Sequence, residues 1–197
     1  GPSSPTESLK RPALENEINN IFNNLTKSFI ENRNFCRFFQ ASSSEMFGES
    51  NVPLDEKSEL SANSPYAEAK INCHKAGQGL AEKYDWPIIS GILFNHESEF
   101  RAENFLFSKI VNSAIKISQD KSQTVTVGSL DLTRDWSYAE DIVKGFYNIT
   151  KTGESYSYVL GSGIGSSIED ILNITFSYFN LDWNDYCLLY TSPSPRD

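Results

Sequence analysis

The segment WPIISGILFN, Trp86–Asn95, decides the fold because it is apolar on both of its alternating faces. A strand of this kind is typical of a parallel sheet that is covered by helices on both sides, since neither face of the strand meets water. We therefore expect Trp86–Asn95 to be an inner strand of an α/β sheet.

Helix and strand patterns alternate on both sides of this segment. Some stretches carry apolar residues at helical spacing, and others are short apolar runs bounded by turn residues. The predicted helices cover residues 12–32, 64–84, 104–118, 139–149 and 167–179, and the other predicted strands cover residues 36–42, 123–130 and 156–162. This alternation predicts a Rossmann-like parallel sheet with flanking helices, wound by right-handed crossovers.

One domain accounts for most of the chain. A length of 197 residues with 39% hydrophobic content is enough to build a single core. We expect this domain to span residues 1–185. The Ser- and Pro-containing end, residues 186–197, is expected to be an unstructured tail.

The composition argues against several classes of protein. A formal net charge of -9 opposes binding to nucleic acid or to an anionic membrane surface, because both need clustered Lys and Arg. Three widely spaced cysteines and two histidines argue against a metal centre or a disulfide framework. The sequence contains no apolar run near the ~18 residues of a membrane span and no secretory signal pattern. We expect an intracellular, cytoplasmic protein.

Polar residues gather where two of the predicted strands end. Ser42–Glu45 follow the strand at 36–42, and Asn95–Glu97 follow the strand at 86–95. Ligands of such sheets bind beyond the carboxyl ends of the strands. Both clusters are therefore candidates for a binding site.

A glycine-rich turn, GSGIGSS, lies between a predicted strand and a predicted helix, which is the setting of a dinucleotide-binding turn. That fingerprint needs its third glycine three positions after the second, whereas Gly165 follows Gly163 by only two. No suitably placed acidic residue follows about 20 residues later. We interpret the segment as a plain strand-to-helix turn.

The segment SPYAEAK, Ser64–Lys70, begins the helix at 64–84, with Ser64 as the N-cap and Pro65 in the first turn. Tyr66 and Lys70 are four residues apart, so they project from one helix face. A phenol titrates near pH ~10, and a neighbouring ammonium lowers that pKa. The pair can therefore accept a proton from an alcohol that is being oxidised. An isolated pair of this kind also fits a solvated helix face.

The neighbouring motifs favour a functional role for the Tyr66–Lys70 pair over a solvated helix face. Hydroxyls and a carboxylate end a strand about twenty residues before a Tyr–Lys helix, and this resembles the extended short-chain dehydrogenase/reductase family. The order and spacing of SSSE, SPYAEAK, GILFNHES, NFLFSKI and LDLTRDWSYAEDIV are similar to those of the GDP-mannose 4,6-dehydratase family. The likeness runs from about residue 1 to residue 179 and is densest between residues 40 and 141.

The resemblance implies a reaction and a role for four residues. The family converts GDP-mannose to GDP-4-keto-6-deoxymannose, a step toward GDP-fucose, by transient oxidation at C4, elimination across C5–C6 and return of hydride to C6, with NADP as cofactor. Tyr66 would take the proton of the 4-hydroxyl, and Glu45 would take the C5 proton. Ser43 would position the sugar, and Lys70 would hold the nicotinamide ribose.

The resemblance also implies binding residues and an assembly. His96 and Arg101, with Tyr66 and Lys70, match positions near NADP, while Asn95 and Arg134 match positions near the diphosphate of GDP-mannose or a related nucleotide sugar. A homo-oligomer, dimer or tetramer, would form through the helices near residues 12–32 and 64–84.

Each of these residues also has a plainer interpretation. Ser43 fits a turn and Glu45 a solvated loop. His96 fits a packing position, and the pair Arg134–Asp135 fits a local ion pair. His74 lies within the Tyr–Lys helix and is expected to be structural.

The chain departs from the family pattern in three places. The family opens with a glycine-rich βα turn and strands that hold the adenosine end of NADP, and we expect this chain to start inside the fold, after those elements. Ser43 stands where the family usually has threonine. Glu99 and Phe100 replace residues of a basic stretch, so Arg101 alone remains there.

Three hypotheses follow. The first is the C-terminal part of a GDP-mannose 4,6-dehydratase-like lyase, which as a fragment could be inactive. The second is a non-catalytic dimerisation module derived from such an enzyme. The third is another nucleotide-sugar dehydratase or epimerase.

Overall fold

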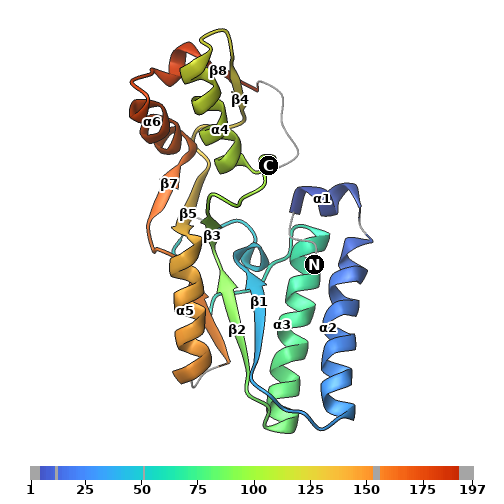
Figure 1. The fold of residues 1–197 in the computed structure, drawn as a ribbon. Helices are drawn as coiled ribbons and strands as arrows, with labels where there is room; N and C mark the ends of the chain where they lie inside the picture. The colour runs from blue at the N-terminus through green and yellow to red at the C-terminus, as the bar shows by residue number, and fades with distance from the viewer. Residues whose placement is uncertain (1–4, 12, 51, 153–155, 191–197) are drawn as a thin grey trace. The chain divides into compact units, whose positions relative to one another are not determined.

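The chain folds into two structural units in a computed structural model that describes residues 5–11, 13–50, 52–152 and 156–190 (Figure 1). The first unit contains the described residues up to Phe94 together with Asp141–Leu160. The second unit contains Asn95–Glu140 and the described residues from Gly161 onward. The sequence predicted one domain over residues 1–185, so this division is a finding of the structure.

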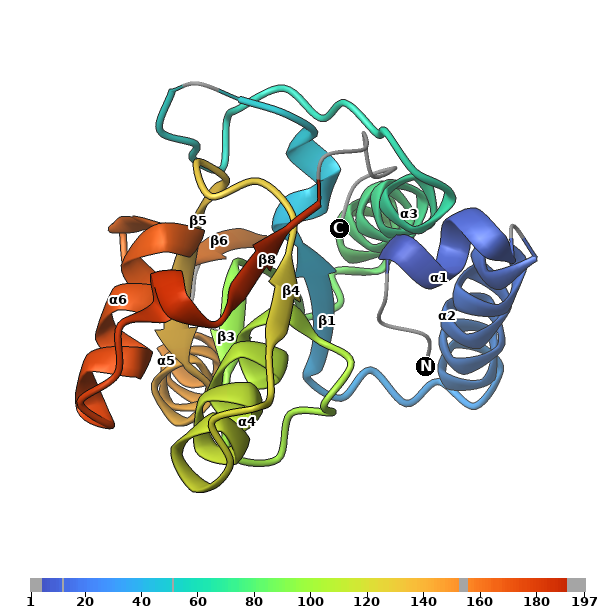
Figure 2. The same ribbon diagram turned by 90° about the horizontal axis from the view of Figure 1, so that it is seen from above.

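The first unit is built on a parallel sheet of three strands in the order β1-β2-β6. The strands are β1 (Phe38–Ser43), β2 (Ile88–Leu93) and β6 (Ser157–Leu160), and the helices are α1 (Pro5–Lys10), α2 (Leu14–Glu31), α3 (Pro65–Tyr84) and α5 (Ala139–Thr152). Figure 2 shows α3 and α5 on opposite sides of β1, with α2 beside α3. The predicted parallel sheet between helices is therefore confirmed.

The inner strand β2 lies within the apolar segment Trp86–Asn95. Its first five residues are all buried, as expected for a strand covered on both faces. Gly91 has a specific role there, because a Cβ atom at this position would lie 2.5 Å from the Phe39 ring. That ring packs on Phe146 of α5 with 4.6 Å between ring centroids, so the glycine makes room for the contact between the sheet and α5.

The helix α3 begins and ends as its sequence indicates. The Ser64 hydroxyl accepts a hydrogen bond from the Ala67 amide at 3.1 Å, and Pro65 occupies the first turn. At the other end Asp85 adopts the left-handed conformation with φ 48°. Helices α3 and α2 pack on each other through residues that include Ile18, Phe22 and Cys73.

The N-terminal part of the first unit differs from the sequence prediction. The predicted elements begin at residue 12, whereas the structure has helix α1 before it. The buried Ser8 hydroxyl of α1 accepts a hydrogen bond from the Tyr66 amide at 3.2 Å. This bond satisfies one of the donors at the start of α3. Helix α2 begins at Leu14, and the predicted start at Pro12 lies outside the described residues.

The second unit contains two small sheets. Their strands are β3 (Asn95–Glu97), β5 (Thr133–Tyr138) and β7 (Gly165–Ser167) in one sheet, and β4 (Val125–Val127) with β8 (Cys187–Leu189) in the other. β3 pairs parallel with β5, β5 antiparallel with β7, and β4 parallel with β8. Helices α4 (Leu106–Gln119) and α6 (Ile168–Tyr178) share a core in which Ile110, Leu172 and Phe176 are fully buried.

Several strands of this unit were not predicted. β3 and β7 have three residues each, which is too short for an alternating pattern to register. β8 lies in the segment 186–197 that was expected to be unstructured, and there the structure differs from the prediction. Its pairing with β4 supplies the backbone hydrogen bonds, including one from Val125 to Tyr186 at 2.9 Å. Residues 191–197 lie outside the described part of the chain.

Candidate functional site

The Tyr66–Lys70 pair lies on α3 beside the carboxyl-terminal half of β1. The Lys70 ammonium is 5.5 Å from the centroid of the Tyr66 ring. It also donates a hydrogen bond to the backbone oxygen of Ala41 at 2.8 Å, which ties α3 to β1. Burial lowers the pKa of the Lys70 ammonium, and the neighbouring Cys73 thiol opposes that shift. The predicted shared face of the two residues is therefore present.

The second half of the candidate site is the turn that ends β1. Ser43 is the N-cap of a 3-10 helix, Ser44–Phe47, and its hydroxyl accepts a hydrogen bond from the Glu45 amide at 3.3 Å. Met46 and Phe47 are buried and anchor the turn to Ile71 of α3. The carboxylate-bearing Glu45 itself is half-buried. The fold thus fixes the backbone that carries the carboxylate.

A glycine closes this turn. Gly48 has φ 70°, a left-handed value that favours glycine, and its amide donates to the Glu45 oxygen at 3.2 Å. A Cβ atom here would lie 2.5 Å from the backbone oxygen of Ser61, so the close approach also requires glycine. The four predicted catalytic residues belong to one unit. Tyr66 and Lys70 lie on α3, which contacts both β1, which ends at Ser43, and the 3-10 helix that carries Glu45.

The other four predicted site residues, Asn95, His96, Arg101 and Arg134, belong to the second unit. Asn95 and His96 lie on β3 and pair with Trp136 and Ser137 of β5. Both side chains are half-buried. The structure places these two residues on a strand that directly follows β2 in the chain, where sequence reasoning expected only the end of one long strand.

The guanidinium of Arg101 is held within its own loop. It donates to both carboxylate oxygens of Glu97, at 2.8 and 3.2 Å, and to the backbone oxygen of His96 at 3.3 Å. It also lies 4.2 Å from the centroid of the Phe105 ring. Glu97 is buried, so this pair fixes the loop after β3. The sequence analysis named Glu97 in a strand-end cluster but did not predict its pairing with Arg101.

Arg134 and Asp135 do not form the local ion pair that was the plainer interpretation of their sequence. The Arg134 guanidinium donates to the backbone oxygen of Thr133 at 2.9 Å. The Asp135 carboxylate accepts from the Ser162 amide at 2.9 Å and from the Gly163 amide at 2.7 Å. An internal carboxylate thus occupies the amides of the glycine-rich turn, which supports its interpretation as a plain turn and not a phosphate site.

A buried histidine on α3 has more partners than the sequence suggested. The His74 Nδ1 atom is 2.8 Å from the Ser90 hydroxyl, which is itself 2.8 Å from the Ser42 hydroxyl. All three side chains are buried. The sequence contained one sign of this cluster, the polar residue Ser90 in the middle of an apolar strand.

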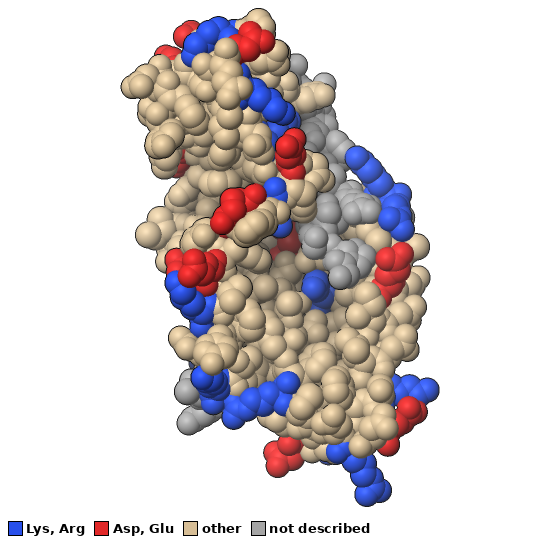
Figure 3. Space-filling view, viewed as in Figure 1, with Lys and Arg blue, Asp and Glu red and all other residues tan. Residues whose placement is uncertain are grey.

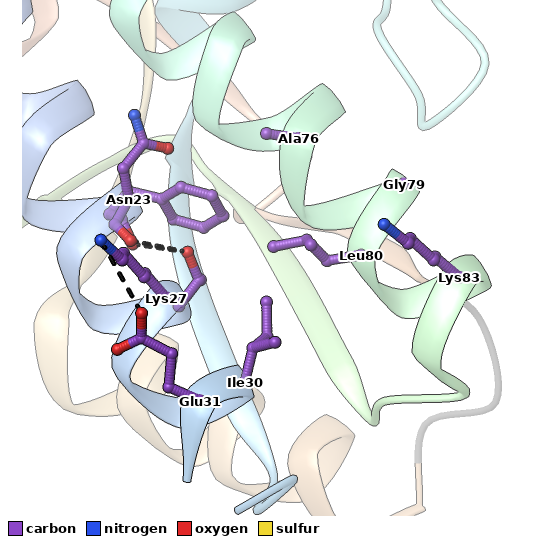
Figure 4. A pocket seen from close by; sticks show the side chains of 10 residues that line it. Asn23, Lys27, Ile30, Glu31, Ala76, Gly79, Leu80 and Lys83 are labelled. Carbon is purple, nitrogen blue, oxygen red and sulfur yellow. Dashed lines mark hydrogen bonds and ion pairs between the residues drawn. The ribbon is translucent and has the colours of Figure 1, made fainter. Parts of the chain in front are cut away.

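A groove lies between α2 and α3 (Figure 4). Leu80 of α3 and Ile30 of α2 point into it, and the ion pair between Lys27 and Glu31, 3.7 Å apart, lies along α2. Neither Tyr66 nor Lys70 lines this groove. It is therefore a feature separate from the predicted catalytic pair.

Charge is distributed evenly on the face shown in Figure 3. Among the described residues on that face, Lys and Arg lie close to Asp and Glu, and much of the remaining surface is uncharged. No helix in the described ranges is long and apolar enough to cross a membrane. Within the same ranges no group of three or more His, Cys, Asp or Glu side chains is arranged to hold a metal ion.

Comparison with known proteins agrees with this geometry. A Rossmann-like sheet with a Tyr–Lys helix defines a short-chain dehydrogenase fold, and the model of the GDP-mannose 4,6 dehydratase family matches residues 3–188. The chain belongs to the GDP-mannose 4,6-dehydratase family.

The curated relatives are longer proteins. GDP-mannose 4,6 dehydratase 2 of Arabidopsis thaliana is 34% identical over 157 residues, which cover 80% of this chain and 42% of that protein. The GDP-mannose 4,6-dehydratase of Sinorhizobium fredii is 36% identical over 141 residues, covering 71% and 40%. The human GDP-mannose 4,6 dehydratase is 33% identical over 144 residues, covering 73% and 39%. The chain thus spans about two fifths of the length of these relatives.

Solved structures share the fold at low sequence identity. RMD from Pseudomonas aeruginosa, solved with NADPH, has a TM-score of 0.90 and 18% identity over 99% of this chain and 67% of that one. DesIV of Streptomyces venezuelae, a dTDP-glucose 4,6-dehydratase, has a TM-score of 0.86 and 16% identity over 96% and 58%. The fold class predicted from the sequence is confirmed.

Proposed function

We propose that this chain carries the catalytic residues of a GDP-mannose 4,6-dehydratase, a lyase that converts GDP-mannose to GDP-4-keto-6-deoxymannose. The observation that carries the proposal is the pairing of Tyr66 and Lys70 on α3 beside the β1 turn that bears Ser43 and Glu45. Membership of the family supports the same reaction.

Tyr66 is the proposed base for the first step. It would act as a phenolate stabilised by the Lys70 ammonium and take the proton of the sugar 4-hydroxyl. The phenol so formed would give a proton to C5 when hydride returns to C6. Lys70 keeps its place because Ala41 accepts one of its three N–H donors, and the ammonium has two more for a ribose or sugar hydroxyl.

Glu45 is the proposed base for the elimination. A ketone at C4 acidifies the C5 proton, and Glu45 would remove that proton and return it to the departing 6-hydroxyl as water. Its half-buried position on the fixed turn leaves the carboxylate accessible while its backbone is held. Ser43 would position the sugar, since its hydroxyl already accepts the Glu45 amide and retains its own proton for donation.

The proposed cofactor is NADP. When bound, it would accept hydride from C4 and return it to C6, so the overall reaction is redox-neutral. The donors of Lys70 fit the hydroxyls of a nicotinamide ribose. NADPH in the RMD structure is consistent with a nicotinamide cofactor in this fold.

The residues of the second unit have proposed binding roles. His96 and Arg101 are assigned to the cofactor, and Asn95 and Arg134 to the diphosphate of the nucleotide sugar. The Arg101 guanidinium is hydrogen-bonded to Glu97. Its proposed contribution is therefore a positive charge held at a fixed position near the cofactor.

The test is turnover of GDP-mannose by the 197-residue chain with NADP, followed by mass spectrometry for the loss of one water. We expect product formation to fall about 10²- to 10⁴-fold in Tyr66→Phe, because the general base is removed. Tyr84→Phe is the matched control at the far end of the same helix. Equal turnover in Tyr66→Phe and the parent would contradict the assignment. A folded parent chain with no turnover would favour the non-catalytic alternative.

A homo-oligomer is proposed as the working state. On α2, Ile21 and Leu25 are one turn apart and about half exposed, and each directly precedes in the chain a residue that lines the groove between α2 and α3, Phe22 and Thr26 respectively. The rim of the groove carries Glu31 as well as Lys27 and Lys83, so a second copy related by a two-fold axis could meet charges of opposite sign. We therefore assign this face to a second copy of the chain.

Sedimentation of the parent and of Leu25→Glu tests the oligomer. We expect the variant to sediment as a lighter species, because a buried carboxylate in an apolar interface is costly. Ile174→Glu, at an exposed apolar position on α6, is the control. Identical sedimentation of Leu25→Glu and the parent would rule out this face as the interface.

The cytoplasmic location stays a prediction that cell fractionation can test.

A further inference from the structure

Three strands of the first sheet each contribute one serine to the same cluster, in which Ser42 and Ser90 are buried and Ser157 is half-buried. Ser42 lies on β1, Ser90 on β2 and Ser157 on β6. The register pairs Ser90 directly with Ser157, and Ser42 follows the partner of Ser90 on β1 by two residues, so all three face the same side of the sheet. The side that they share is the one covered by α3.

The imidazole of His74 meets all three hydroxyls. Its Nδ1 atom is 2.8 Å from the Ser90 hydroxyl and 3.4 Å from the Ser42 hydroxyl, and its Nε2 atom is 3.4 Å from the Ser157 hydroxyl. His74 is 7% exposed. One helix side chain is thus bonded or close to hydroxyls from every strand of the sheet.

A tyrosine fixes the backbone of the same residue. The Tyr156 hydroxyl donates to the backbone oxygen of His74 at 2.5 Å, and the two rings lie 5.2 Å apart. Gly77 makes this approach possible, since a Cβ atom at that position would lie 2.6 Å from the Tyr156 hydroxyl. The side chain and the backbone of His74 are therefore both held by the sheet and its flanking segment.

The placement of His74 along α3 connects this cluster to the catalytic pair. Tyr66, Lys70 and His74 are spaced four residues apart, so they form one stripe on the helix. Lys70 bonds the backbone of Ala41, and His74 reaches the side chain of the next residue, Ser42. Helix α3 is thus fastened to consecutive residues of β1 by consecutive turns.

The cluster works with an uncharged imidazole. Neutral histidine offers one donor and one acceptor, and each serine hydroxyl can be both, so the bonds can be satisfied without a buried charge. Burial lowers the pKa of His74, and the positive charge of Lys75 adds to this.

We propose that His74 is a positioning residue that, through the hydroxyls of Ser42, Ser90 and Ser157, sets where Lys70 stands relative to β1. Its catalytic meaning rests on the proposed function, but the positional claim concerns Lys70 alone and can be tested without turnover. Loss of the cluster would let the turn of α3 that carries Lys70 move away from Ala41.

The test is the titration of Lys70 in the 197-residue chain, followed by NMR of labelled lysine side chains, with the Lys70 signal assigned by its loss in Lys70→Met. In the parent we expect Lys70 to titrate below the ordinary value of about 10.4. In His74→Phe, which keeps a ring and removes both nitrogens, the midpoint should move up toward that ordinary value. His74→Asn, which restores a donor and an acceptor near Ser90, should bring it partly back.

Two further variants keep the test decisive. Tyr84→Phe, at the far end of α3 from Lys70, is the control and should leave the Lys70 midpoint unchanged. Ser90→Ala serves if His74→Phe does not fold, and it should produce the same upward shift. An unchanged Lys70 midpoint in folded His74→Phe, or in Ser90→Ala, overturns the proposal. Because no arm uses turnover, inactivity of the chain would leave this result intact.

Discussion

The two units hold their polar candidate residues in different ways. In the first unit, Lys70 gives one donor to the backbone of β1, and Glu45 stands on a turn that is fixed by its neighbours. In the second unit, the Arg101 guanidinium donates to both carboxylate oxygens of Glu97, and the Asp135 carboxylate accepts from two amides of the glycine-rich turn. The hydrogen-bond partners thus distinguish a side chain that keeps donors or acceptors for a ligand from one whose groups are used to fix a loop.

The largest expected effect of a single change is at Glu45. Glu45→Gln should lower turnover of GDP-mannose about 10²- to 10⁴-fold, because an amide cannot accept the C5 proton. The unfolding midpoint should stay the same, since the turn is held by backbone bonds and by buried Met46 and Phe47. Glu59→Gln, in the exposed loop that follows, is the control. Full activity of Glu45→Gln would place the elimination base elsewhere.

The next effect belongs to the second unit and should appear in stability. Arg101→Ala leaves the buried Glu97 carboxylate without its main partner, which should cost about 3 kcal/mol of unfolding free energy in a urea titration. Adding Glu97→Gln to Arg101→Ala should recover part of that loss, because the uncompensated charge is removed. Unchanged stability of Arg101→Ala would show that the pair with Glu97 does not hold this loop and would break the contrast between the units.

Stability should also depend on pH through His74. Its pKa is lowered in the folded state, so the unfolded chain takes up the proton first as the pH falls. The stabilisation is complete above about pH 6.5 and is lost below that value, at about 1.4 kcal/mol for each unit by which the pKa is lowered. Urea titrations of the parent and His74→Phe at several pH values isolate this contribution from those of the carboxylates. If the unfolding free energies of the parent and His74→Phe changed with pH in the same way, folding would not lower the pKa of His74, and the prediction would be wrong.

The smallest effects compare two glycines of α3. Gly79 has open space around its missing Cβ, so Gly79→Ala should stabilise the chain by about 0.5–1 kcal/mol through helix propensity. Gly77→Ala gains the same propensity but places a Cβ 2.6 Å from the Tyr156 hydroxyl, so we expect net destabilisation. Thermal unfolding of the two glycine variants tests whether the Tyr156 hydroxyl packs closely against α3 at His74 and Gly77. Equal gains at both positions would contradict it.

Local chemistry explains what the sequence could predict. The Ser64 cap, the stripe of Tyr66 and Lys70 and the apolar strand β2 are each encoded within a few neighbouring residues, and the structure confirms them. Helix α6 likewise begins at Ile168, directly after its N-cap Ser167, which forms a capping box with Asp170.

What the sequence could not predict depends on partners far apart in the chain. The short strands β3, β7 and β8 have too few residues for a periodic pattern, and their strand conformation comes from pairing with other segments. The partners of His74 come from three different strands, whose order and register no local pattern records. Ser90 within an apolar strand was the one local sign of that cluster.

Cofactor binding tests the central claim, that the Tyr66–Lys70 stripe is a ligand site, most directly. Calorimetry of the 197-residue chain with NADP should show binding in the micromolar range that weakens at least about tenfold in Lys70→Ala, a loss of roughly 1.4 kcal/mol. Lys75→Ala, at an exposed position on the next turn of α3, should bind as the parent does. Equal affinity in Lys70→Ala and Lys75→Ala, or no binding by the folded parent chain, would contradict the account.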